Sequence, residues 1–220
     1  MNFGKYQDVL EHAKACLGAE DFAHTYRVLG YALQILETKK KAQADVVILA
    51  ALLHDLGRAQ GETYEHDKRG SEMGFSYLVQ KGYAEDLARH VADCILTHSN
   101  TSETKPQSLE AQILFDADKL DTIGAIGIAR IIGEYAKSNI PMYLLDDSGL
   151  LMPGKKDEPA SLIKKYKQKL KNRGKTLYTD KAKKIAAKHT VAMAEYFKHI
   201  GKEASGNHKK TMELLQNHLF

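Results

Sequence analysis

Two histidines and two aspartates in this chain are of the types that together bind divalent metal ions. His54 and Asp55 are adjacent and directly follow the apolar run from Val46 to Leu53. His24 lies upstream on a segment with helical apolar spacing, and Asp118 lies downstream. Imidazole and carboxylate ligands suit Mn, Mg, Fe, Ni, Co or Zn ions, among which the sequence does not distinguish. A divalent ion activates water and polarises a phosphoryl oxygen, so hydrolysis of a phosphate ester or anhydride is the chemistry best served.

Each of these residues also has a structural explanation. A histidine at a helix end, as expected for His54, is favoured by the helix dipole. His24 taken singly could be a hydrogen-bonded helix histidine, and Asp118 a helix-terminal carboxylate. Arg27 follows His24 by three residues and therefore shares its helix face, where it would suit an anion.

The order of histidine, His-Asp pair and aspartate resembles the HD-domain superfamily of metal-dependent phosphohydrolases. The resemblance runs from about residue 21 to about residue 200. It implies an all-helical fold, one divalent ion and hydrolysis of phosphate-containing substrates, often nucleotides. The ion would be held by His24, His54, Asp55 and Asp118. The motifs that carry the resemblance, the last of them similar to a subgroup of small stand-alone bacterial HD hydrolases, are His24 with Arg27-Val28, Ala50 to Gly57, His98-Ser99 and Asp116 to Arg130.

Four more residues are candidates for substrate contacts. Dinuclear members of the superfamily hold a second ion with extra histidines in the region where this chain has His66 and His98. We do not expect a second metal, and a solvated loop histidine at 66 and a helix-end cap at 98 are equally open. Lys119 would neutralise a phosphate, and Asp121 would orient water or protonate a leaving group. The alternative is that these two pair with each other or with neighbours.

The apolar spacing is helical nearly everywhere and predicts an all-α fold, an HD-domain helical bundle with a carboxy-terminal helical extension. We expect one domain over residues 1–220, with core motifs in 21–130, a loop or lid over 139–160 and a basic helical extension over 160–220. The predicted helices are 3–17, 21–37, 42–55, 70–80, 85–97, 108–137, 160–172 and 179–199.

The carboxy-terminal part of the chain is basic. Residues 151–220 contain 17 Lys and Arg against 6 Asp and Glu, whereas residues 1–150 contain 15 against 22. A positive surface attracts phosphorylated ligands or nucleic acid. An apolar stripe opposite the lysines predicts instead a packed helix with a solvated basic face, so we expect nucleic-acid binding to be weak and salt-sensitive. The stripe consists of Leu162, Ile163, Tyr166 and Leu170.

Other function classes are excluded by composition. No run approaches the roughly 18 apolar residues of a membrane span, and the start of the chain lacks a signal pattern, so we expect a cytoplasmic protein with no membrane partner. Cys16 and Cys94 are far apart, which predicts neither a disulfide framework nor a thiol metal site.

The sequence therefore predicts a metal-dependent hydrolase that acts on a small phosphorylated metabolite, a nucleotide first among them. Two alternatives stay open. One is a nucleotide- or nucleic-acid-binding module with a vestigial metal site, and the other is an HD-type di-iron oxygenase, which would need two metals. The sequence is also compatible with an oligomer.

Overall fold

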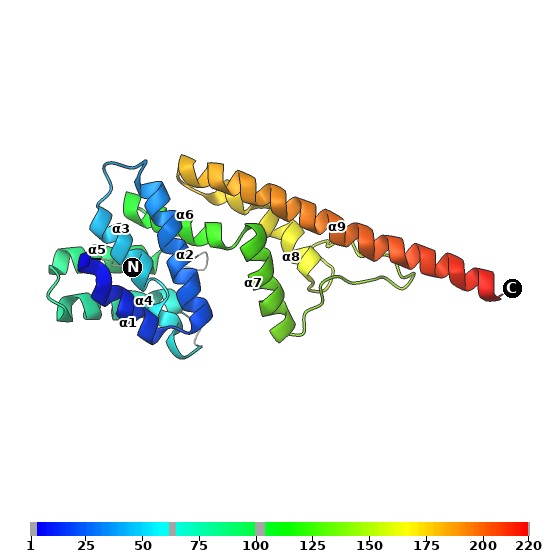
Figure 1. Ribbon diagram of the computed structural model, residues 1–220, viewed down its shortest axis with the longest axis horizontal. Coiled ribbons are helices and arrows are strands. Elements are labelled where there is room, and N and C mark those ends of the chain that lie inside the picture. The colour runs from blue at the N-terminus through cyan, green and yellow to red at the C-terminus, as the bar shows by residue number, and fades with distance from the viewer. Residues whose placement is uncertain (1–3, 62–64, 100–103, 220) are drawn as a thin grey trace. The chain divides into compact units, whose positions relative to one another are not determined.

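The computed structural model describes residues 4–61, 65–99 and 104–219, and in these segments the regular elements are helices (Figure 1). One isolated bridge joins Leu145 and Leu151. The predicted all-α fold is confirmed. None of the helices in these segments combines the length and apolar character needed to cross a membrane. The helices are η1 (Gly4–Tyr6), α1 (Gln7–Cys16), α2 (Ala19–Leu36), α3 (Ala44–Leu53), η2 (Leu56–Gly61), α4 (His66–Gln80), α5 (Glu85–Leu96), α6 (Leu109–Asp121), α7 (Gly124–Lys137), α8 (Leu162–Gln168), η3 (Leu170–Thr176) and α9 (Asp180–Leu219).

The chain divides into two compact units. Unit 1 comprises Met1–Asp121 with Leu177–Lys183, and unit 2 comprises Thr122–Thr176 with Lys184–Phe220. Compact units need not fold independently, so the expected single domain stays a prediction.

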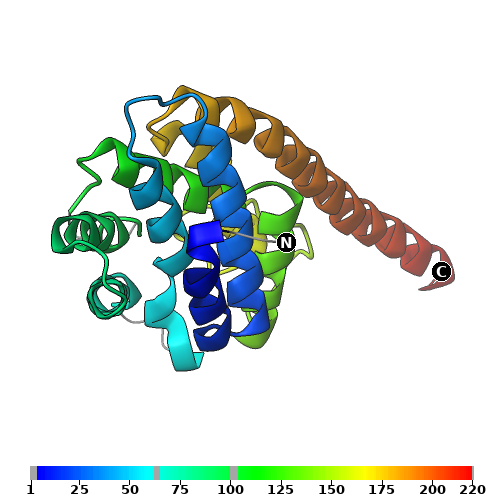
Figure 2. The same cartoon turned by 60° about the vertical axis from the view of Figure 1, so that its left-hand side comes forward.

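Helix α3 is the centre of unit 1. It packs beside α2 and α6 (Figures 1 and 2). Val46, Val47 and every residue from Leu49 to Leu53 are buried, as expected of a helix that is apolar on all sides. Because α3 ends inside the core, the two residues that follow it, His54 and Asp55, are buried as well.

The predicted helix over 108–137 is wrong in one respect, since the structure divides it into α6 and α7. Ile123 is extended, and Gly124 has a φ of +77°, a left-handed conformation that glycine adopts without the steric cost of a side chain. The break directly follows Asp121. It places Asp118 and Asp121 in the last turn of α6.

Other boundaries differ from the prediction as well, and the larger differences are these. Helix α4 begins at His66 rather than at residue 70, and α9 continues to Leu219 rather than ending at residue 199. Helix α9 runs through Gly201 and Gly206, because glycine weakens a helix by only about 1 kcal/mol per residue and does not terminate it. The predicted helix over 160–172 is an α-helix only to Gln168 and then a 3₁₀ helix, and its predicted apolar stripe is buried.

The segment 139–160 is organised by its own backbone. The Met152 amide donates to the Leu144 carbonyl at 2.8 Å, and the Asp146 amide donates to the Leu150 carbonyl at 2.9 Å. The Leu162 amide at the start of α8 donates to the Pro141 carbonyl at 3.0 Å. These bonds form a short hairpin-like loop in unit 2. Its role as a lid stays a prediction.

Asp116 anchors the start of α9 within unit 1. Its carboxylate accepts hydrogen bonds from the Tyr178 amide at 2.8 Å, and from the Thr179 amide and hydroxyl at 2.7 Å each. The side chain is fully buried, and burial is the main reason that its pKa is raised above the ordinary value. Asp116 therefore belongs to the fold, although it lies in the acidic cluster around Lys119.

Replacing Asp116 with Ala should lower the free energy of unfolding by about 2–4 kcal/mol, because three donors lose their acceptor in a buried place. Chemical unfolding followed by circular dichroism measures the change. Asp146→Ala is the matched control. Its carboxylate also accepts two backbone N–H groups, from Ser148 and Leu150 at 2.9 Å each, but it is exposed. That variant should lose less than about 1 kcal/mol, and equal losses would contradict the anchoring role.

Candidate metal centre

The two central imidazoles are oriented by hydrogen bonds to oxygen atoms. His54 Nδ1 lies 2.9 Å from the Ala51 carbonyl, and His24 Nδ1 lies 2.7 Å from Asp121 Oδ2. A carbonyl only accepts, so His54 Nδ1 carries the proton and Nε2 holds a lone pair. The two Nε2 atoms approach each other to 3.3 Å. Both side chains are buried, and their Nε2 atoms point into one space.

Two carboxylates face the same space. Asp118 Oδ1 lies 3.2 Å from His24 Nε2, and Asp55 Oδ2 lies 3.5 Å from it. Asp55 Oδ2 is also 3.6 Å from His54 Nε2. The ligand atoms of His24, His54 and Asp55 all lie within 4.8 Å of one another. The four residues expected to hold a metal are thus brought together from α2, the end of α3 and α6.

His66 and His98 form a second group around the other oxygen of Asp55. Their Nε2 atoms lie 3.8 Å and 3.7 Å from Asp55 Oδ1, and the three residues satisfy the same 4.8 Å criterion. His98 Nδ1 donates to the Ile95 carbonyl at 2.6 Å, so it caps α5 and also turns Nε2 toward Asp55. The solvated-loop alternative for His66 is wrong, because this side chain is buried in the first turn of α4.

Lys119 and Asp121 are paired with neighbours rather than with each other. The Lys119 ammonium forms a short hydrogen bond to Asp118 Oδ2 and donates to the His98 carbonyl at 3.1 Å. Asp121, besides its bond to His24, accepts from Arg27 Nε at 2.6 Å and from its Nη2 at 3.1 Å. The predicted shared face of His24 and Arg27 is confirmed, since both contact Asp121.

Arg58 is a site residue that the sequence analysis missed. Its Nε donates to Asp55 Oδ1 at 2.9 Å, and its Nη2 lies 3.3 Å from His66 Nε2. The available signal was its position three residues after Asp55, one helical turn on. The turn between them depends on Gly57, where a Cβ atom would lie 2.0 Å from the His66 carbonyl oxygen. No side chain fits there, so this close approach requires glycine.

The charges of the site are strongly coupled. Burial lowers the pKa of His24, but hydrogen bonds to Asp118 and Asp121 outweigh it and raise the pKa to about 9. Burial lowers the pKa of His54 to about 4. Burial would raise the pKa of Asp55 and Asp118, yet neighbouring cations hold both well below the ordinary value.

These residues fit a divalent ion. At neutral pH both carboxylates are ionised and His54 presents a neutral nitrogen. The raised pKa of His24 shows that its surroundings favour a positive charge at Nε2. A bound cation would place its positive charge at the same position, between this nitrogen and the carboxylates. Two nitrogen and two oxygen donors form the mixed set that borderline divalent metals prefer. Asp121 bonded to His24 Nδ1 is an outer carboxylate of the kind that orients metal-binding histidines.

Comparison with known proteins places the site within a segment that resembles one domain family. The family model of the HD domain matches residues 21–123, which include all the residues described above. This part of the chain, which holds the candidate metal ligands, is thus similar to the HD domain. The chain is 35% identical over 114 residues to the uncharacterized protein YpgQ of Bacillus subtilis. That match covers 50% of this chain and 54% of YpgQ, so the aligned part spans about half of that relative.

Several solved structures are similar to this chain over most of its length. The structure of YpgQ in complex with ADP is 25% identical to this chain and has a TM-score of 0.69. The match covers 89% of this chain and 93% of YpgQ. An HD-superfamily hydrolase from Bacillus thuringiensis is 27% identical and has a TM-score of 0.68. The match covers 90% of this chain and 96% of that protein. A Lactobacillus plantarum protein is 22% identical and has a TM-score of 0.71. The match covers 92% of this chain and 98% of that protein, and it shows that the two folds are alike.

The titration of His24 leads to a prediction for the metal-free protein. Metal binds the neutral imidazole, whereas His24 with a pKa of about 9 is protonated at pH 7. Binding must therefore release a proton, and the apparent affinity for Mn²⁺ should rise roughly tenfold per pH unit until pH approaches that pKa. His54, already neutral above its pKa of about 4, adds no dependence in this range. Calorimetric titration in buffers of different ionisation heat measures both quantities.

Asp121→Asn is the control for this pH dependence. It leaves the four candidate ligands in place and removes the carboxylate whose hydrogen bond helps to raise the pKa of His24. The rise in affinity should then level off at lower pH than in the unmodified chain. A Mn²⁺ affinity that is flat between about pH 6.5 and 8.5 would contradict the assignment of His24 as a ligand.

Proposed function

We propose that this protein is a metal-dependent phosphohydrolase that cleaves a phosphate ester or anhydride bond of a nucleotide. The observation that carries the proposal is the convergence of two imidazole Nε2 atoms and two ionised carboxylates in a buried site with arginines at its edge. The solved complex of the relative YpgQ with ADP supports a nucleotide as the substrate class.

We assign the metal to His24, His54, Asp55 and Asp118. When bound, a divalent ion supplies a water of lowered pKa and charge neutralisation at a phosphoryl oxygen. Asp121 keeps the imidazole of His24 in the orientation that presents Nε2. One metal per chain is our proposal, although His66 and His98 provide two further nitrogens beside Asp55.

The cations of the site divide into two roles. The side chain of Lys119 is only 5% exposed and its ammonium is bonded to Asp118, so we assign it to positioning that carboxylate rather than to neutralising the phosphate. The side chains of Arg27 and Arg58 are 28% and 32% exposed. Each arginine is fixed by a carboxylate of the site, so their guanidinium groups can bind anionic oxygens without large reorganisation.

Turnover of nucleotides tests this proposal. The full chain with Mn²⁺ should release phosphate or pyrophosphate from at least one nucleoside mono-, di- or triphosphate, measured in separate assays. Asp55→Asn should reduce kcat by at least about 10³-fold, since it removes charge from the centre of the site. No release from any nucleotide, with metal shown to be bound by elemental analysis, would contradict it. Two metals with oxygen consumption would favour the oxygenase, and nucleotide binding without turnover would favour the binding module.

Arg58 provides a sharper test of the site edge. Arg58→Ala should lower kcat/KM by about 10²-fold because one positioned cation is lost from the phosphate-binding region. Arg89→Ala is the matched control, since this guanidinium lies over the Phe75 ring at 3.9 Å and has no contact with the site residues described above. Metal content is measured for both variants. An Arg58→Ala enzyme with unchanged kcat/KM would show that Arg58 does not contact the substrate.

A further inference from the structure

The last part of α9 has an apolar face that the described part of the chain does not cover. Met212 is 46% exposed, Leu215 is 49% exposed and Leu219 is 74% exposed. Earlier on the same helix the corresponding face is covered, because Phe197 is buried and stacks on Tyr166 with ring centroids 4.0 Å apart. The apolar face of α9 therefore continues beyond the part that other residues of the chain cover.

The exposed and the covered parts form one stripe. At 100° per residue, its positions lie within an arc of about 80° of the helix circumference. No Lys, Arg, Asp or Glu occupies these positions, although residues 151–220 contain 17 Lys and Arg. The stripe is about 33 Å long at 1.5 Å per residue. It consists of Phe197, Gly201, Ala204, His208, Met212, Leu215 and Leu219.

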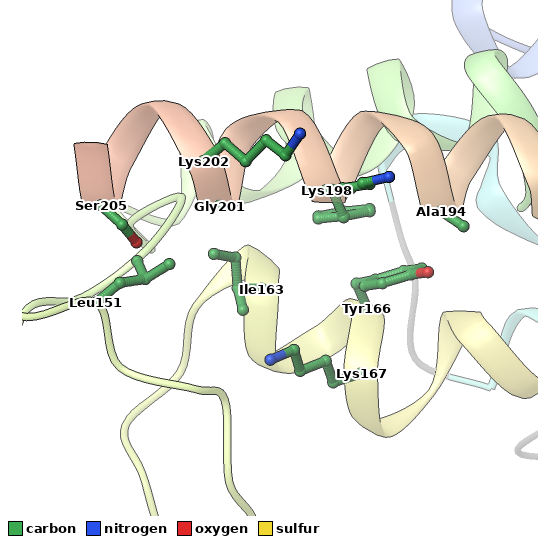
Figure 3. A pocket seen from close by; sticks show the side chains of 10 residues that line it. Leu151, Ile163, Tyr166, Lys167, Ala194, Lys198, Gly201, Lys202 and Ser205 are labelled. Carbon is green, nitrogen blue, oxygen red and sulfur yellow. The ribbon is translucent and has the colours of Figure 1, made fainter. Parts of the chain in front are cut away.

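A groove opens on this stripe in unit 2. Its volume is about 510 Å³, and it lies between α9 on one side and α8 with Leu151 on the other (Figure 3). Gly201 and Ser205 contribute to the wall formed by α9. A Cβ atom at Gly201 would have Leu151 Cδ2 as its nearest neighbour, at 3.9 Å, so the glycine leaves room in the groove between α9 and Leu151.

The stripe is self-complementary when two copies of the helix run antiparallel. The steps between its positions are 4, 3, 4, 4, 3 and 4 residues, which read the same from either end and are symmetric about position 208. Antiparallel pairing about that position sets the two small residues of the stripe opposite large ones, and it sets His208 opposite itself and Leu219 beside the already covered Phe197. Gly201 faces Leu215 of the second copy, and Ala204 faces Met212 of the second copy. Positions 197, 208 and 219 are 11 residues apart, a spacing that keeps them on one face of a nearly straight helix.

We propose that this face is the interface of a homodimer in which two α9 helices pair antiparallel. Leu215 of each copy occupies the groove beside Gly201 of the other. A two-fold arrangement uses the same patch on both copies and closes, so it leaves no apolar stripe exposed. A second copy fits better than an unrelated partner because Met212 and Leu215 match the small residues Ala204 and Gly201 of the same stripe.

The neighbouring residues Leu214 and Leu215 provide a matched test. Their exposures are 50% and 49%, but Leu214 lies about 120° from the centre of the stripe. The unmodified chain and Leu214→Lys should sediment at twice the 24.6 kDa chain mass, whereas Leu215→Lys should sediment at that mass. Because the interface contains Leu215 twice, the dissociation constant should rise by roughly 10³-fold. Circular dichroism confirms that the helix content of each variant is unchanged.

Gly201→Leu tests the groove from the other side. A Cβ atom at this position meets Leu151 at an ordinary van der Waals distance in the single copy, and the groove lies beside it, so this variant should remain folded but dissociate. A monomeric unmodified chain at about 50 µM, or equal masses for the two Leu→Lys variants, would overturn the proposal. A monomer that binds anionic vesicles through Leu215 would also overturn it, and would assign the face to a lipid surface.

Discussion

The burial of carboxylates beside imidazoles at the end of α3 is the constraint on which unit 1 depends. Ionised groups are costly in a protein interior unless hydrogen bonds and opposite charges surround them. Here Asp55 is fully enclosed and is contacted by Arg58 and the histidines of the site. The apolar helix α3 places Asp55 in the core, and α2 and α6 supply the groups that stabilise it there. The packing of these three helices and the composition of the site therefore determine each other.

Helix α6 shows how one short element gives three aspartates different roles. Asp118 and Asp121 are three residues apart and share a face, so both reach His24. Asp116 lies about 200° from Asp118 around the helix and bonds instead to the start of α9. Lys119 bridges Asp118 to the His98 carbonyl. The acidic cluster thus combines a candidate ligand, a positioning group and a structural anchor.

Much of this arrangement could be predicted from the sequence. Helical periodicity predicted the helices, and the HD resemblance selected the four ligand candidates before any contact was known. Arg58 could not be found this way, because its role depends on the turn that Gly57 allows against α4. The separate role of Asp116 was also hidden, since its partners at Tyr178 and Thr179 are more than 60 residues away. Both cases depend on tertiary contacts, to which local spacing is insensitive.

The length of α9 was missed, since the predicted helix ended at residue 199 and the structure continues it through Gly201 and Gly206. Their cost is small in a helix of 40 residues. One of them, Gly201, also leaves the space on which the proposed pairing of two chains depends.

The most direct test of the account is a crystal structure of the chain with Mn²⁺, with the ion located by its anomalous scattering. The account predicts a peak within about 2.4 Å of four protein ligand atoms. These atoms are Nε2 of His24, Nε2 of His54 and one oxygen each of Asp55 and Asp118. A fully occupied ion bonded only to Asp55, His66 and His98, or no ion in the site at saturating Mn²⁺, would contradict it.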